Sequence, residues 1–133
     1  MPKFNTHLPE RELRMLPHDT EAEEAVLGCV IQENDKYDEA AEFIREPDFF
    51  YGDDCKLLWK IITKMVRDGK KIDYITLNDQ LTEDQRKTCS MYWITGLTSN
   101  APAASNIEAY ARIVAEKFAK RQIIIGTKEM QDV

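Results

Sequence analysis

Glycine is scarce and scattered in this sequence of 133 residues. Its five glycines are Gly28, Gly52, Gly69, Gly96 and Gly126. They form neither a G-x-x-x-x-G-K-[ST] nor a G-x-G-x-x-G pattern, the two motifs in which close glycines let the backbone approach a phosphate group. We therefore expect no nucleotide hydrolysis by this chain alone and no cofactor site within it.

Cysteine and histidine are too few and too scattered for a disulfide framework or a metal centre. Cys29, Cys55 and Cys89 are an odd set without C-x-x-C spacing, and the first two fall on apolar helical faces. Reduced cysteines of a protein core have this distribution, which favours a cytoplasmic protein. His7 and His18 have no further ligands close by, so we expect no metal site and interpret His18 as a turn residue.

Basic charge is in deficit. The chain has 18 Lys and Arg against 24 Asp and Glu, a net charge of −6, and its first hundred residues hold 13 basic and 20 acidic side chains. Affinity for nucleic acid phosphates is built from Lys and Arg, so this balance argues against a protein whose main task is to grip phosphates. It also supplies no basic recognition helix for a helix-turn-helix DNA reader.

Long apolar runs are absent as well. Residues 1–16 are interrupted by prolines and charges, so they form no signal peptide and are expected to be a flexible N-terminal arm. Residues 88–107 carry no charge and are long enough to span a bilayer, yet Gly96, Pro102 and several Ser and Asn would be costly in lipid. We expect no membrane contact, and a short helix followed by a loop in this stretch.

Helical periodicity is the main pattern that the sequence does contain. Apolar residues recur at three- and four-residue spacing between helix start and stop signals, and no strand-like alternation lasts beyond a few residues. Capping boxes are expected at Thr20–Glu23 and Thr82–Gln85, and Asp53 or Asp54 is expected to cap a central helix. The expected helices are residues 20–32, 37–44, 53–69, a short one from 76, one after 82 and a last core helix with Tyr92, Trp93, Ile94 and Leu97. The predicted fold class is all-α, with a small globular bundle of about five to six helices.

Two features could suggest ligand chemistry, but each has a simpler interpretation. The adjacent acids Asp53 and Asp54 stand where a helix dipole and cap favour negative charge, so they are not read as a catalytic pair. The rings of residues 49–51 could stack on the bases of single-stranded DNA, yet no basic residues interleave them and core packing is favoured. Ile72 is expected to plug the core from an extended connector at residues 70–74.

The final helix starts clearly but has no stop signal. Ser105 and Glu108 match an S-x-x-E capping box, and helical spacing continues from Asn106 to about Asp132 without a proline. A helix of that length is roughly 40 Å long, whereas a compact domain of this size has a radius of gyration of about 14 Å. Part of the helix is therefore expected to project; the alternative is a bend at Gly126 that folds it back on the core.

The projecting part carries an apolar stripe that no later segment covers. We expect a second copy of the chain, or more of a longer parent protein, to cover it. The basic residues interpreted as the solvated face of this helix are Lys117, Lys120, Arg121 and Lys128. The candidate interface residues are Phe118, Ile123, Ile124, Ile125 and Met130, and no catalytic residue is proposed.

Four sequence blocks, taken in order, are more specific than any single motif. They are His18 to Gly28 (HDTEAEEAVLG), Asp48 to Tyr51 (DFFY), Gly69 to Leu77, and Asn100 to Lys117, which contains NAP and ASNIEAYARIV. In this order they resemble the N-terminal domain of DnaB-type replicative DNA helicases over about residues 16–130. One departure is residues 82–90, where that family commonly has a longer segment closing in a Gly-Gly pair.

The resemblance implies a division into a flexible arm at residues 1–16, a helical globule at 17–104, and the first arm of a truncated helical hairpin at 105–133. In that family, hairpins of two subunits pack together, and six subunits form a trimer-of-dimers collar through which single-stranded DNA passes. The collar would dock a DnaG-type primase, and a helicase loader is a further implied partner. ATP and Mg²⁺ would bind an absent RecA-like motor domain, which makes the parent protein an ATP-dependent 5′–3′ helicase, whereas this chain alone would not unwind DNA.

The alternative is a freestanding helical adaptor, from a phage or an accessory system, that captures primase or caps a helicase ring. It predicts a reading frame that ends at Val133, whereas a helicase fragment predicts a frame that continues to a G-x-x-x-x-G-K-[ST] motif. The helicase fragment is the preferred interpretation, and the adaptor comes second.

Overall fold

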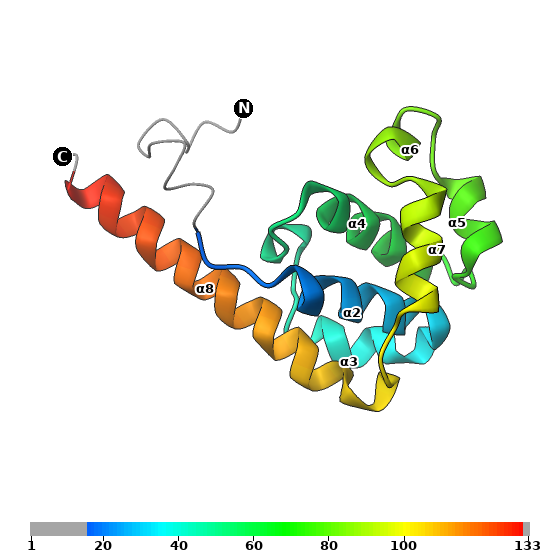
Figure 1. Cartoon of the computed structure of the whole chain (residues 1–133), viewed down its shortest axis with the longest axis horizontal. Coiled ribbons are helices and arrows are strands. Elements are labelled where there is room, and N and C mark those ends of the chain that lie inside the picture. Colours follow the sequence, from blue (N-terminus) through cyan, green and yellow to red (C-terminus); the bar gives the residue numbers. More distant parts are fainter. Residues whose placement is uncertain (1–15, 132–133) are drawn as a thin grey trace.

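The computed structural model describes residues 16–131 of the chain, with side chains placed as far as Thr127. In this range it contains seven α-helices, three short 3₁₀-helices and no β-strand, which confirms the predicted all-α class. One long helix extends from the helical globule (Figure 1). The α-helices are α2 (Thr20–Gln32), α3 (Tyr37–Ala41), α4 (Asp53–Arg67), α5 (Tyr74–Gln80), α6 (Gln85–Thr88), α7 (Met91–Ser99) and α8 (Ile107–Gln131), and the 3₁₀-helices are η2 (Asn34–Lys36), η3 (Pro47–Phe49) and η4 (Ala104–Asn106).

Helix α2 runs through the middle of the globule, between α4 and α8 (Figure 1). Eight of its positions are buried, including the unbroken run from Val26 to Ile31, because helices cover it on nearly every side. The Asp19 carboxylate caps its start by accepting a hydrogen bond of 2.9 Å from the Ala22 N–H. The predicted capping box of Thr20 and Glu23 is therefore wrong, since the Glu23 side chain is turned into the globule.

Helix α4 is the amphipathic core helix that its sequence predicts. Its buried stripe consists of Cys55, Leu58, Trp59, Ile62 and Met65. The helix stops at Gly69 as predicted, because this residue adopts a φ of 70°, in the left-handed region that favours glycine. Its start differs from the prediction: Gly52 is the N-cap residue and makes no side-chain bond, while the Asp54 carboxylate accepts from the adjacent Cys55 N–H at 2.7 Å.

The connector and the small helices α5 and α6 close one end of the globule. Ile72 is 1% exposed, so the predicted plug is confirmed. Helix α5 starts earlier than predicted, because Asp73 and Thr76 form a capping box with bonds of 2.8 and 2.9 Å. The predicted reciprocal bonds at Thr82–Gln85 are present, at 2.9 and 3.1 Å.

Helices α2 and α7 approach each other closely at Gly28. A methyl group on Gly28 would clash with the Leu97 carbonyl oxygen and would lie 2.9 Å from the Cβ atom of Ala101. Only glycine allows the two backbones to come this near. The contact holds the buried face of α7 on α2 and turns Tyr92 outward, so the prediction of Tyr92 as a core residue is wrong: it is 92% exposed.

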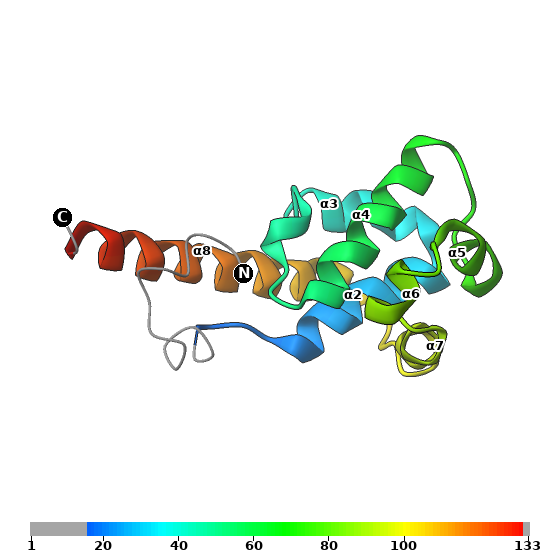
Figure 2. The same cartoon turned by 90° about the horizontal axis from the view of Figure 1, so that it is seen from above.

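Helix α8 continues without a break past Gly126, so the alternative of a bend at that residue is wrong. Its first half is fixed to the globule by Ile107, Ala111 and Val114, each of which is fully or almost fully buried. Its second half extends beyond the globule in both views (Figures 1 and 2). The predicted projecting helix is confirmed.

The entry into α8 differs from the prediction. The 3₁₀-helix η4 places Ser105 inside its own turn, directly before α8 begins at Ile107. The Glu108 carboxylate instead bonds Arg112, one turn further along α8, at 2.9 Å. The predicted capping box of Ser105 and Glu108 is therefore wrong.

Candidate functional site

Arg121 fastens α8 to the globule where the helix begins to project. Its guanidinium group donates hydrogen bonds of 2.9 Å to the carbonyl oxygens of Pro17 and Phe49, and the residue is only 5% exposed. It lies seven residues, or two helical turns, after the buried Val114 and so continues the same face. The interpretation of Arg121 as part of the solvated face is wrong.

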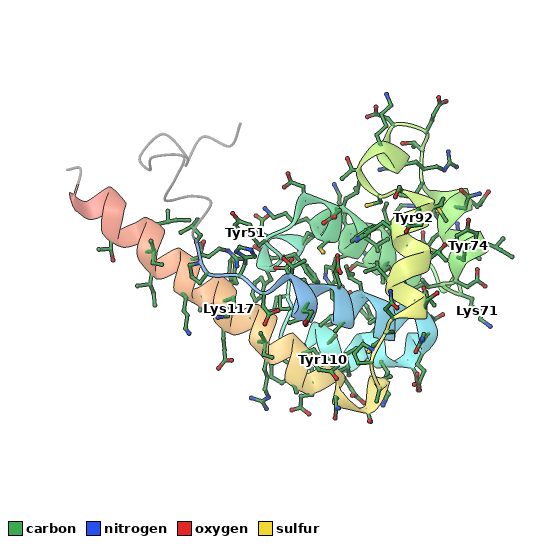
Figure 3. The ribbon with its side chains drawn as sticks, viewed as in Figure 1. Tyr51, Lys71, Tyr74, Tyr92, Tyr110 and Lys117 are labelled. Atoms are coloured by element: carbon green, nitrogen blue, oxygen red, sulfur yellow. The ribbon has the colours of Figure 1, made fainter. Side chains whose placement is uncertain are left out.

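The other three basic residues assigned to that face are Lys117, Lys120 and Lys128. Lys120 is exposed, and Lys117, which Figure 3 labels on α8, is partly exposed. Lys128 falls beyond the side chains that the structure describes.

Glu23 supports the same junction from inside the globule. It is 3% exposed, and its carboxylate accepts hydrogen bonds from the N–H groups of Tyr51 at 2.7 Å and Gly52 at 3.2 Å. Burial raises the pKa of Glu23, while these bonds and the positive charge of Arg121 oppose the rise. Burial likewise lowers the pKa of Arg121, and the charge of Glu23 opposes that change. The two buried charges therefore stabilise each other where α2, the segment at residues 50–52 and α8 meet.

Stacked rings surround this charged pair. The rings of Tyr51 and His18 have centroids 4.1 Å apart, and those of Phe49 and Phe118 are 4.2 Å apart. The guanidinium carbon of Arg121 lies 5.3 Å from the centroid of Tyr51. Figure 3 shows Tyr51 at the edge of the globule beside α8. We call Glu23, Arg121 and these four rings the junction.

The predicted interface residues fall into two groups. Phe118 is half-buried against Phe49 and belongs to the junction. Ile123 and Ile124 are 68% and 37% exposed, and Ile125 is half-buried, on the part of α8 beyond Arg121 that we call the distal arm. Met130 lies in the same helix, but its side chain is outside the described range. The structure thus places an apolar band on the distal arm and leaves two of its isoleucines open to solvent.

An open groove of about 920 Å³ lies between α2, α7 and the first turns of α8. No local sequence pattern predicts this groove. Glu24 on its wall accepts a hydrogen bond of 3.0 Å from the indole N–H of Trp93. The exposed Tyr92 and the half-buried Tyr110 also line it (Figure 3). With Asp19 and Glu21 on its lining, this acidic groove combines aromatic walls with negative charge.

The chemistry at these surfaces is that of packing and charge. In the described part of the chain, no group of three or more His, Cys, Asp or Glu side chains is arranged to hold a metal ion. None of the helices between residues 16 and 131 has both the length and the apolar character needed to cross a bilayer. The distal arm thus exposes apolar side chains, and the acidic groove combines aromatic with acidic ones.

A helical globule from which one long helix projects defines the class of the protein, an all-α domain. The sequence profile described as "DnaB-like helicase N terminal domain" matches residues 15–116. The chain therefore belongs to the family of DnaB N-terminal domains, which confirms the resemblance seen in its sequence.

Individual relatives agree with this assignment. The replicative DNA helicase DnaB of Haemophilus influenzae is 36% identical over 110 residues, which cover 81% of this chain and 23% of that protein. DnaB of Buchnera aphidicola is 32% identical over 132 residues, or 97% of this chain and 28% of that protein. The crystal structure of the N-terminal domain of DnaB helicase from Mycobacterium tuberculosis matches with a TM-score of 0.80 and 28% identity, over 87% of this chain and 86% of that one. The chain thus spans between 23% and 28% of the length of these two helicases.

Proposed function

We propose that this DnaB N-terminal domain builds the collar of a hexameric replicative helicase, and that the distal arm of α8 holds neighbouring subunits together. The observation that carries the proposal is the exposure of Ile123 and Ile124, 68% and 37%, on an arm that the buried Arg121 fixes to the globule. Apolar surface of this kind is removed from water when a second arm packs against it. Two arms packed together form a dimer, and three dimers complete a six-subunit collar.

The acidic groove is the surface that we assign to partner proteins. Glu21, Glu24 and Asp19 would attract a basic segment, and the exposed Tyr92 offers the type of aromatic contact that is enriched at protein interfaces. A DnaG-type primase is the proposed occupant, and a helicase loader is a second proposed partner of the collar.

In this proposal the unwinding reaction belongs to the parent helicase and not to the residues described here. A RecA-like motor domain of the parent protein would bind ATP and Mg²⁺ and would move 5′–3′ along the single-stranded DNA that passes through the ring. The present chain would assemble subunits and recruit partners, in the cytoplasm, without being an enzyme itself.

The mass of the chain in solution tests the assembly. Light scattering over a concentration series should show a mass that rises from the 15.4 kDa monomer towards a dimer or a larger ring. The change Ile124→Asp should abolish the rise, because a carboxylate buried between two apolar arms costs several kcal/mol unless it is paired. The helical content of the variant, measured by circular dichroism, should stay unchanged.

A matched control is available on the opposite end of the molecule. Ile75 on α5 is 75% exposed, so Ile75→Asp makes the same chemical change without touching the distal arm. This variant should assemble like the wild type. A wild-type chain that stays monomeric at every concentration, and that takes up no primase C-terminal domain when this is added, would contradict the proposal.

A further inference from the structure

Helix α4 carries a row of basic side chains along its outer face. Lys56, Lys60 and Lys64 follow one another at four-residue intervals, and Arg67 extends the row. Successive members are about 6 Å apart along the axis, and the whole row is about 16 Å long. Helix α4 lies at the surface of the globule in both views (Figures 1 and 2).

Interactions within the described part of the chain do not account for this row. Lys64 pairs with Asp68 at 3.5 Å, but Lys56, Lys60 and Arg67 form no ion pair with any described residue. Positive charge near a helix C-terminus is favoured by the dipole, which explains Lys64 and Arg67. Lys56 and Lys60 lie in the first turns and at the middle of α4, where the dipole gives no such stabilisation.

An open groove of about 880 Å³ runs beside the row. Leu57 and Ile61, one turn apart on α4, are half-buried and form an apolar floor. Arg45 adds a fifth basic side chain, against three acidic ones, so the lining carries a formal charge of 5 − 3 = +2. The whole chain has a net charge of −6, and this basic groove therefore stands out as a local reversal of sign.

We infer that the basic groove binds an acidic amphipathic segment of a partner protein. Its apolar side would lie on Leu57 and Ile61, and its carboxylates would face Lys60, Lys64 and Arg67. This is the helix-in-groove mode of recognition, with charge complementarity along one edge.

The same groove is poorly suited to a nucleic acid strand. Trp59 is the aromatic residue on the described lining, and at 1% exposure its ring cannot stack on a base. The inference rests on α4 and the segment around η3, and it does not depend on the distal arm or on the acidic groove.

Fluorescence anisotropy with a labelled synthetic peptide tests the inference. The probe is a peptide of about fifteen residues with leucines at i, i+3, i+4 and i+7 and glutamates on the other faces. It should bind the full chain at low ionic strength, and the double change Lys60→Glu with Lys64→Glu should weaken binding about tenfold. Added salt should weaken it as well. Ile61→Ala should also reduce the affinity, because it removes part of the apolar floor without changing the charge.

The control pair is Lys87→Glu with Lys120→Glu. Both side chains are exposed and lie outside the groove, so the change in net charge is the same. Binding should stay within about twofold of the wild type. Three results would overturn the inference: no binding of the acidic peptide, equal loss in the groove and control pairs, or displacement of the peptide by a single-stranded dT oligonucleotide that binds more tightly.

Discussion

At the scale of single residues, Glu23 and Arg121 connect parts of the chain that are far apart in sequence. Arg121 reaches carbonyl oxygens 72 and 104 residues away, and Glu23 holds two N–H groups of the segment before α4. Both side chains bond backbone groups, so the loss of either one leaves buried backbone groups without a hydrogen-bond partner, which costs about 1–3 kcal/mol. These bonds fix where α8 lies on the globule.

The change Glu23→Gln tests this pair. It should lower the free energy of unfolding by about 1–3 kcal/mol at neutral pH, because an amide has a single acceptor oxygen and turns its NH2 group towards one of the N–H donors of Tyr51 and Gly52. Burial raises the pKa of Glu23 above its ordinary value of 4.5, so the folded state takes up this proton more readily than the unfolded state does. Protonation of Glu23 therefore raises the free energy of unfolding of the wild type as the pH falls from 7 towards 4.5. The difference in this free energy between the wild type and the variant should widen over that range.

Urea denaturation at several pH values measures both effects. Glu108→Gln is the control, because Glu108 forms an exposed pair with Arg112 and its loss should cost no more than about 0.5 kcal/mol. If the difference in free energy of unfolding between the wild type and Glu23→Gln narrows as the pH falls, burial does not raise the pKa of Glu23.

Sequence patterns could not assign these two residues because their partners are distant. Glu23 fits an S/T-x-x-E box with Thr20, and this local match hides its bonds to Tyr51 and Gly52. Charged residues usually face solvent, so the sequence pattern groups Arg121 with the lysines of α8. Arg121 lies two helical turns after the buried Val114, and this spacing is the sequence signal that indicates its burial.

At the scale of elements, local sequence signals predict most of the helices correctly. The bounds of α2 follow its apolar periodicity, and Gly69 ends α4 where only a left-handed residue fits. The sequence pattern predicts the start of α5 at Thr76, which is too late, because Asp73 is the N-cap residue and Thr76 is the third helical residue. The exposure of Tyr92 depends on which face of α7 meets α2, and a helix of nine residues with a weak apolar pattern does not reveal that face.

The close contact of α2 and α7 gives a prediction at this scale. Gly28→Ala should lower the free energy of unfolding by about 2–3 kcal/mol, because the new methyl group meets the backbone of Leu97 and cannot be accommodated by a rotamer change. Gly96→Ala, in α7 itself, is the matched control: its Cβ would have no atom within 4 Å, so it should stabilise the helix by about 0.5–1 kcal/mol. Thermal or urea unfolding of the two variants measures the difference, and changes of the same sign and size would argue against a tight crossing.

At the scale of the whole molecule, the order of four sequence blocks was enough to identify the family. The exposed isoleucines could also be predicted, since a helix longer than the domain must leave it. The two grooves could not, because each is built from elements that no local pattern brings together: the acidic groove joins α2 to α7, and the basic groove joins η3 to α4.

Assembly through the distal arm has a thermodynamic signature for the molecule as a whole. If the arms associate only in the folded state, the midpoint of thermal unfolding should rise by several degrees as the protein concentration increases about a hundredfold. The same series on Ile124→Asp should give a constant midpoint. Calorimetry or circular dichroism can follow both, and a constant midpoint for the wild type would speak against folded-state association.

The position of Arg121 also has a mechanical consequence. About 15 Å of helix lies between this residue and Gln131, so α8 is a rigid lever whose fulcrum is the buried junction. A rotation of about 10° at the fulcrum would carry the tip through roughly 2.6 Å, which is comparable to the helix shifts that separate alternative subunit packings. Small changes in how Pro17 and Phe49 hold the guanidinium group would in this way be magnified at the far end of the arm.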